Sequence, residues 1–139
     1  MKPANRRTIL QTLAASLALA ARTEAAQIPD GIVSKAQAKL DPQPFGDLRV
    51  YREGNTEHLK GLTVGSLELT AGQSPHPAHT HPEEEVLIIT DGHAEISIAG
   101  KVTKVGPDDV MYVGSNHLHG IVNKSPAPMM FYYVKWLGK

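Results

Sequence analysis

The sequence predicts an all-β fold, a small double-sheet β-barrel, for the chain from residue 45 onward. Short apolar runs recur there at roughly 8–12-residue spacing, which is typical of sandwiches and barrels. Glycine, proline, asparagine and aspartate separate these runs, and no strong helical period lies between them. Because a closed or double-sheet arrangement removes exposed strand edges, it is favoured for a domain of this length.

The first strands are predicted between residues 48 and 69. The segment 48–51 is apolar with partial alternation, and Gly54-Asn55 supplies a turn after it. The segment 62–69 also alternates, but its phase changes at Gly65-Ser66. Since an extra residue in one strand shifts the alternation, this change predicts a β-bulge at that position.

Hairpin signals connect the strands of the second half. The apolar run Val86–Ile89 ends at Asp91-Gly92, a pair that favours a tight hairpin turn. Apolar and polar residues then alternate from Ala94 to Ile98, as expected for a half-buried strand. Further strands are predicted over residues 102–105, 110–113 and 129–136.

Residues 1–26 differ in residue pattern from the rest of the chain and are predicted to be a signal peptide. Arg6-Arg7 precedes the apolar run Ile9–Ala21, which is too short to span a bilayer but suits the hydrophobic region of a signal. The segment resembles twin-arginine export signals, which implies export to the periplasm or the extracellular space of a bacterium. No stable membrane anchor is expected, since the run is short and no cysteine follows it.

The remaining chain is predicted to consist of an N-terminal arm, residues 27–44, and a single barrel domain, residues 45–139. Proline and glycine interrupt the arm at positions 29, 31, 42 and 44. Between these positions, residues 32–40 could form a short helix. We expect the arm to wrap the domain or an oligomer partner.

Composition excludes several functional classes. Lys+Arg and Asp+Glu both number 14, so the formal net charge is zero. Nucleic acid is therefore not expected as a partner, because phosphate binding needs a concentrated basic face. The chain contains no cysteine, which excludes disulfides, thiolate metal ligands and a cysteine nucleophile.

The stretch "HPAHTHPEEE", residues 76–85, concentrates side chains that bind metals. His79, His81 and Glu85 have even spacing, so on an extended strand all three would point to one face. Two imidazoles and a carboxylate on one face can converge on a single cation. Glu83 has the same parity, and parity alone does not choose between Glu83 and Glu85.

A second histidine pair follows in "GSNHLHG", residues 114–120. His117 and His119 again have a spacing of two residues. If the intervening hairpins return this segment beside the first one, a third imidazole would complete a site of three histidines and one carboxylate.

The two histidine segments resemble the signature motifs of the cupin superfamily. In "HTHPEEEVLIITDG" the first motif falls on His79, His81, Glu85 and Gly92, and this match favours Glu85 over Glu83 as the ligand. In "DDVMYVGSNHLHGIVN" the second motif's histidine falls on His119. The resemblance covers about residues 65–134 and implies a jelly-roll barrel with His79, His81, Glu85 and His119 as metal ligands.

The sequence departs from both motifs in turns and not in ligands. The family's glycine before the first histidine is one residue further away, at Gly72, and His76 lies in the lengthened loop. The usual start and middle of the second motif are replaced by Asp108-Asp109 and Gly114.

Four further residues are predicted to line a pocket or to touch the ligands. His76 lies in the lengthened loop, and His117 is the member of its pair that the motif leaves unmatched. Glu83 could act as a general base or lie at a rim. Tyr112 lies one strand away from the site.

The family hosts many unrelated reactions, so the resemblance implies a metal site more strongly than a reaction. It implies a divalent ion, Mn, Fe, Zn, Ni or Cu, and an oxygenase, isomerase or decarboxylase acting on a small oxygenated molecule. The alternative is a protein that binds a metal or small ligand without turnover. A homodimer is expected by analogy with the family.

Overall fold

The computed structural model describes residues 26–138, and the predicted signal peptide lies outside this range except for Ala26. Within the range no helix is long and apolar enough to cross a membrane. The chain forms nine strands: β1 (Lys39–Gln43), β2 (Gly46–Gly54), β3 (Leu59–Leu69), β4 (Glu84–Asp91), β5 (Ala94–Ile98), β6 (Lys101–Val105), β7 (Val110–Val113), β8 (His119–Val122) and β9 (Met129–Gly138).

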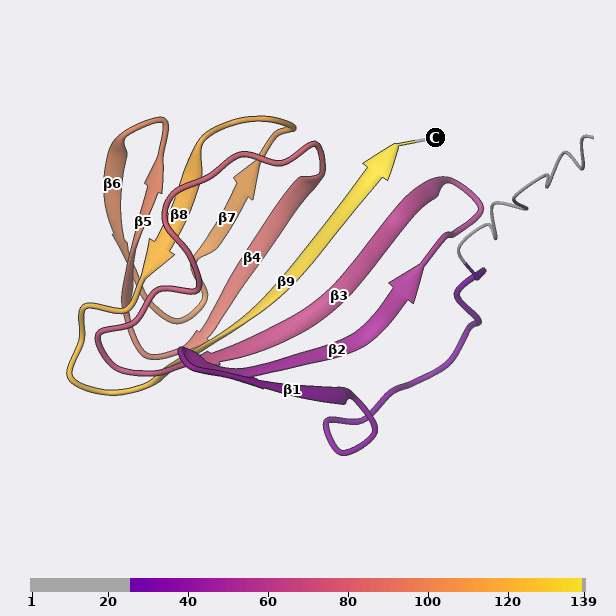
Figure 1. Ribbon diagram of the computed structural model, residues 1–139, viewed down its shortest axis with the longest axis horizontal. Coiled ribbons are helices and arrows are strands. Elements are labelled where there is room, and N and C mark those ends of the chain that lie inside the picture. The colour runs from indigo at the N-terminus through magenta and orange to yellow at the C-terminus, as the bar shows by residue number, and fades with distance from the viewer. Residues whose placement is uncertain (1–25, 139) are drawn as a thin grey trace, which may run out of the picture.

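The strands form two antiparallel sheets, which confirms the all-β, two-sheet prediction. The larger sheet has the order β1-β2-β3-β9-β4-β7, and the smaller one has the order β6-β5-β8. The small sheet lies beside β4 and β7 at one end of the molecule, while β1 to β3 extend to the other (Figure 1). The C-terminal strand β9 lies between β3 and β4, so it joins the two parts of the larger sheet.

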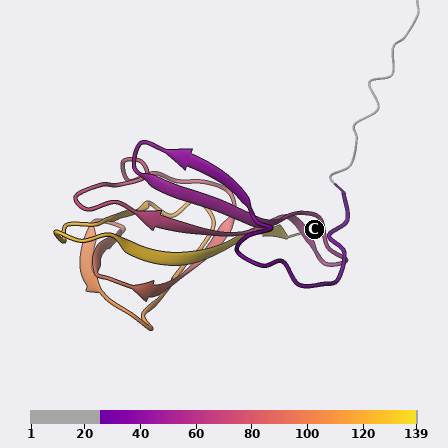
Figure 2. The ribbon, with the colours of Figure 1, turned by 90° about the horizontal axis from the view of Figure 1, so that it is seen from below.

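The hydrophobic core lies between the two sheets, which face each other in the view of Figure 2. Alternating side chains of β3, β4, β7 and β9 point into it, and β5 and β8 cover it from the other side. Its buried members are Leu67, Leu69, Leu87, Ile89, Ala94, Ile96, Met111, Val113, Ile121, Met129 and Phe131. Because burial of apolar area is the main favourable term in folding, this shared core fixes the spacing of the sheets.

The bulge predicted near Gly65-Ser66 lies on the partner strand. Gly65 pairs with Val50 of β2 and Val64 with Arg52, so the extra residue is Tyr51 of β2 and not a residue of β3. A second register shift lies between Lys60 and Thr63. The apolar alternation changes phase because the middle of β3 is covered on both faces: Ser66 is 0% exposed and its neighbour Leu67 is 2% exposed.

The N-terminal arm contributes a strand and not a helix. Ser34 forms a turn in which its carbonyl accepts hydrogen bonds from the N–H groups of Gln37 and Ala38. The chain then extends as β1, which pairs with β2 at the edge of the larger sheet. The turn at Pro44-Phe45 folds the chain back as a hairpin, and pairing with the next strand decides the structure here.

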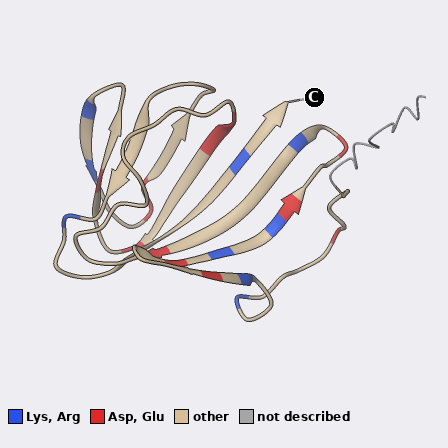
Figure 3. Ribbon diagram, in the orientation of Figure 1, with Lys and Arg blue, Asp and Glu red and all other residues tan. Residues whose placement is uncertain are grey.

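Charged residues of both signs are interspersed along the strands (Figure 3). Among the described strands only β6 and β9 carry basic residues without acidic ones, and they carry just Lys101, Lys104 and Lys135. This distribution agrees with the balanced charge of the sequence.

Candidate metal centre

A pair of backbone hydrogen bonds brings the two histidine segments together. His79 lies in the loop before β4, and His119 is the first residue of β8. The N–H of His79 donates to the carbonyl of His119 at 2.9 Å, and the N–H of His119 donates to the carbonyl of His79 at 3.0 Å. This isolated bridge places their rings side by side, with centroids 4.8 Å apart.

The other two predicted ligands approach from β4 and the loop before it. Glu85 is the second residue of β4 and pairs with Val113 of β7 and Lys135 of β9. The loop that carries His81 is tied down by the N–H of Asn116, which donates to the His81 carbonyl at 2.8 Å. One ligand nitrogen from each of His79, His81 and His119 lies within 4.8 Å of the others.

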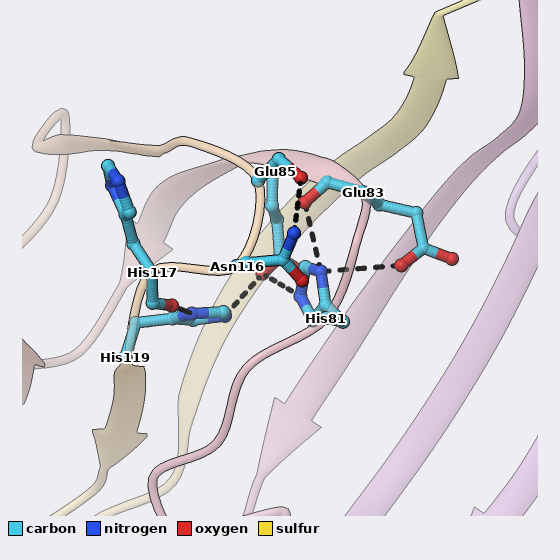
Figure 4. A network of polar contacts seen from close by, with 7 residues as sticks. His81, Glu83, Glu85, Asn116, His117 and His119 are labelled. Atoms are coloured by element: carbon cyan, nitrogen blue, oxygen red, sulfur yellow. Dashed lines mark hydrogen bonds and ion pairs between the residues drawn. The ribbon is translucent and has the colours of Figure 1, made fainter.

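Hydrogen bonds to the backbone orient two of the imidazoles. Nδ1 of His81 lies 3.0 Å from the carbonyl of Glu83, and Nδ1 of His119 lies 2.8 Å from the carbonyl of His117 (Figure 4). Since a carbonyl can only accept, each Nδ1 carries the proton and donates it. In the neutral imidazole, Nε2 is then left as a lone-pair donor, which is the tautomer a metal ligand needs.

Both Nε2 atoms point to one carboxylate oxygen. Oε2 of Glu85 lies 3.4 Å from Nε2 of His81 and 3.1 Å from Nε2 of His119. Ligand atoms held about 2.0–2.2 Å from one ion are about 3.0–3.5 Å apart, so these distances suit a shared cation. Without a cation, a proton on Nε2 of His119 can take its place, since this contact is within hydrogen-bond distance.

His79 completes the donor set. Its Nδ1 is buried and has no hydrogen-bond partner among the described residues. Burial, and secondarily the neighbouring His76, His119 and His81, lowers the pKa of His79, so its ring is held neutral as a ligand requires. The chemistry of these residues therefore fits a divalent transition metal.

The site forms part of the wall of a cavity of about 210 Å³ between the sheets. Most of the lining is apolar and comes from β2, β3, β4, β7 and β9 and from the turn before β2. These side chains include Phe45, Leu48, Leu67, Leu87, Met111 and Phe131. A small molecule bound here would lie against hydrocarbon with the histidine cluster at one side.

Two of the predicted pocket residues lie against the ligands. The ring of His76 packs edge-on against His79, with centroids 3.9 Å apart, and also lines the cavity. Oε2 of Glu83 lies 3.4 Å from Nδ1 of His81, on the side of the ring away from Glu85. Glu83 therefore contacts the back of a ligand and does not line the cavity.

The other two predicted pocket residues lie outside the cavity. His117 is exposed and contributes its carbonyl to His119. Tyr112 lies on the outer face of the larger sheet, 57% exposed, where its hydroxyl donates to Oε1 of Glu84 at 2.9 Å. β7 directs Met111 and Val113 inward and leaves Val110 and Tyr112 outside.

The chain is not extended from residue 79 to residue 85, which was the condition of the parity argument. β4 begins only at Glu84, and residues 80–83 form a loop. The parity of the spacing is therefore not what brings His79, His81 and Glu85 together. The bridge to His119 and the hydrogen bond from Asn116 do so.

Two polar residues of the cavity wall, Tyr133 and Lys135, were not predicted from the sequence. They are two residues apart on β9, so they share its inner face. A lysine inside the most apolar predicted strand was the signal that could have identified them.

Comparisons with known proteins agree with this fold. A family model described as "Cupin domain" matches residues 65–135, and no curated protein matches the sequence. An RmlC-like cupin from Shewanella frigidimarina is 15% identical, with a TM-score of 0.67, and the match covers 82% of this chain and 96% of that one.

Two solved structures with enzyme names also share the fold. The polyketide cyclase RemF from Streptomyces resistomycificus is 17% identical, with a TM-score of 0.63 and coverage of 78% of this chain and 80% of that one. A predicted oxalate decarboxylase from Thermotoga maritima is 19% identical, with a TM-score of 0.61 and coverage of 77% and 99%. The family match spans the strands and the loops that carry the histidine cluster, and the chain belongs to the cupin domain family.

Proposed function

We propose that this protein binds a divalent transition metal through His79, His81, Glu85 and His119 and acts on a small oxygenated molecule held in the adjoining cavity. One observation carries the proposal: Nε2 of His81 and Nε2 of His119 converge on Oε2 of Glu85 at the wall of an apolar cavity. The reaction class is that of an oxygenase, isomerase or decarboxylase.

The residues around the site support a catalytic role. A bound divalent ion would supply Lewis-acid chemistry by polarising an oxygen atom of the substrate. The carbonyls of Glu83 and His117 hold two ligand rings in fixed orientations, so little reorganisation is needed on binding. The apolar walls exclude water and strengthen electrostatic interactions inside the cavity. The name of one structural neighbour, a predicted oxalate decarboxylase, fits this class.

Turnover by metal-loaded protein tests the proposal. Small diketones, phenols and sugar acids would be screened with oxygen consumption and product formation as readouts. We expect activity that disappears on chelation, returns on adding one metal, and is lost in Glu85→Gln. A protein that binds metal but turns over none of these compounds would favour the non-catalytic alternative.

We further propose that the protein is exported, supported by Arg6-Arg7 and the apolar run that follows. A fusion of residues 1–26 to a folded reporter would be assayed in bacterial fractions. Reporter activity in the periplasm that is lost with Arg6→Lys/Arg7→Lys is the expected result, and unchanged export of the variant would contradict a twin-arginine signal.

A further inference from the structure

Two hydrogen-bond donors of β9 face the cavity beside the candidate metal ligands. Lys135 pairs with Glu85 on one side and with buried Thr63 on the other, so its side chain lies on the inner face of the larger sheet. Tyr133, two residues earlier on β9, lies on the same face and pairs with Gly65 of β3 and Leu87 of β4. Both residues line the cavity together with His81 and Glu85.

Neither donor has a partner in the part of the chain that the structure describes. Within residues 26–138 the ammonium group of Lys135 forms no ion pair or hydrogen bond, although Glu85 is its cross-strand neighbour. The neighbouring carboxylate, Glu84, lies on the outer face of the sheet and does not pair with Lys135. Its two oxygens accept hydrogen bonds from Tyr112 and Trp136. Neither donor atom is among the buried side-chain atoms without a partner in the described residues, so both are open to the cavity and available to a ligand acceptor.

Tyr133 is held in place by the strand beneath it. A Cβ at Gly65 would lie 2.3 Å from Cζ and 2.4 Å from Oη of Tyr133, so only glycine lets the ring lie against β3. Burial, and secondarily Glu85 and Glu53, raises the pKa of the Tyr133 hydroxyl. The hydroxyl therefore stays protonated at neutral pH and can donate.

The charged residues of the cavity wall determine whether an anionic or a cationic ligand is favoured. Apart from its histidines, the cavity wall carries one negative charge at Glu85 and one positive charge at Lys135. These cancel, and a bound divalent cation would leave the cavity positive. An anion is then favoured over a neutral molecule, because the net positive charge attracts it.

We propose that Lys135 and Tyr133 form a subsite that binds the carboxylate of the ligand, and that the ligand is a small carboxylic acid with an apolar substituent. This inference rests on the proposed function, because it assigns the substrate class of the same cavity. Drug-sized ligands occupy pockets of about 300–1,000 Å³, so a cavity of about 210 Å³ selects a smaller molecule. The apolar lining accommodates its substituent.

Calorimetric titration with matched acids and amides tests the subsite. Acetate, 3-methylbutyrate and benzoate would each be compared with the corresponding amide, on zinc-loaded and on metal-free protein. We expect the zinc-loaded wild type to bind 3-methylbutyrate or benzoate more tightly than its amide and than acetate. Lys135→Met should lose about tenfold or more of the carboxylate affinity, because a charge-assisted hydrogen bond disappears.

Companion variants separate this role from a loss of folding. Tyr133→Phe should weaken carboxylate binding by about three- to tenfold, as expected for one neutral hydrogen bond. Lys135→Arg should retain the preference for the acid, and Lys104→Met, which removes an exposed charge on β6, should change nothing. Amide affinity, zinc content and thermal unfolding should be the same in wild type and Lys135→Met.

The outcomes distinguish the two proposals. If the protein binds none of zinc, manganese, iron, nickel and copper, the proposed function is wrong, whatever Lys135 does in the metal-free titration; if it binds another of these metals instead of zinc, that metal replaces zinc in the titration. If zinc binds but no acid is preferred over its amide, or if Lys135→Met binds the acids as wild type does, the subsite is overturned while the metal site stands.

Discussion

Gly65 is the residue on which the position of Tyr133 depends. Gly65 has no positive φ, so the backbone itself would tolerate alanine there. The obstacle is the Tyr133 ring, whose Cζ would lie 2.3 Å from the added Cβ. At the scale of single residues, the close contact between a glycine and an aromatic ring shapes one wall of the cavity.

Gly65→Ala should therefore destabilise the domain by about 1–3 kcal/mol, the usual cost of overpacking. Chemical denaturation of a double-mutant cycle measures the cause. In a Tyr133→Ala background the same substitution should cost much less, because the ring is gone. In Tyr133→Phe it should cost as much as in wild type, since Cζ and Cε1 remain. Equal costs in all three backgrounds would contradict the contact.

His79 links stability to pH in the metal-free protein. Its folded-state pKa lies below the ordinary value of 6.5, mainly because of burial. The unfolded chain then takes up a proton at a higher pH than the folded one, so this contribution is complete above pH 6.5 and is lost as pH falls. Thermal unfolding should show metal-free wild type less stable at pH 5.5 than at pH 7.5. His79→Gln should show a smaller difference, and an equal difference would contradict the assignment.

At the scale of elements, Asn123 ties the end of β8 to the end of β3. It is 0% exposed. Its Nδ2 donates to the carbonyls of Leu69, Thr70 and Ala127, and its Oδ1 accepts from the N–H and the hydroxyl of Ser125. The strand that carries His119 is thereby anchored only four residues away from that ligand.

Asn123→Asp keeps the shape of the side chain but removes three donated hydrogen bonds. We expect a loss of about 2–4 kcal/mol in the free energy of unfolding, because buried carbonyls lose their donor and face a carboxylate. Ser125→Ala, the matched control, should cost about 1 kcal/mol. Urea denaturation measures both, and similar costs for the two variants would argue against the anchor.

The positions of most strands were predictable from the sequence. For some strands, the sequence did not show which face points into the core. Turn residues such as Asp91-Gly92 mark where strands end, and they do so locally. Tyr112 was misplaced because β7 alternates apolar residues on both faces, so only the sheet reveals which face is inner. β1 was missed because its partner, β2, lies beyond a turn that local propensity does not predict.

The candidate site was predictable in its residues and not in its geometry. The resemblance to cupins identified His79, His81, Glu85 and His119. The assumed extended strand was absent, and the bridge between His79 and His119 is a contact over 40 residues that spacing does not encode. Lys135 could be placed inside the cavity only when β9 was known to lie between β3 and β4.

At the scale of the whole molecule, the outer face of the larger sheet exposes apolar side chains. Ile88 of β4 pairs with Val110 of β7, and these residues are 39% and 63% exposed, beside Tyr112 at 57%. Exposed apolar groups that cluster on one face commonly mark association surfaces. The homodimer predicted from the sequence would use this face.

Sedimentation equilibrium checks that prediction. We expect a dimeric wild type and a shift toward monomer in Val110→Glu, which places a charge on the outer face. Val102→Glu is the matched control, since Val102 is similarly exposed on β6 of the small sheet. A monomeric wild type, or equal effects of the two substitutions, would contradict a dimer through this face.

The central claim is that the histidine cluster and Glu85 hold a divalent metal. Elemental analysis of protein purified without chelator or affinity metal tests it most directly, with a His79→Ala/His119→Ala variant and with His117→Ala as a matched control. We predict about one divalent transition metal per chain in wild type and His117→Ala, in keeping with a single ligand set, and none in the double variant. Equal metal content in wild type and the double variant would contradict the claim.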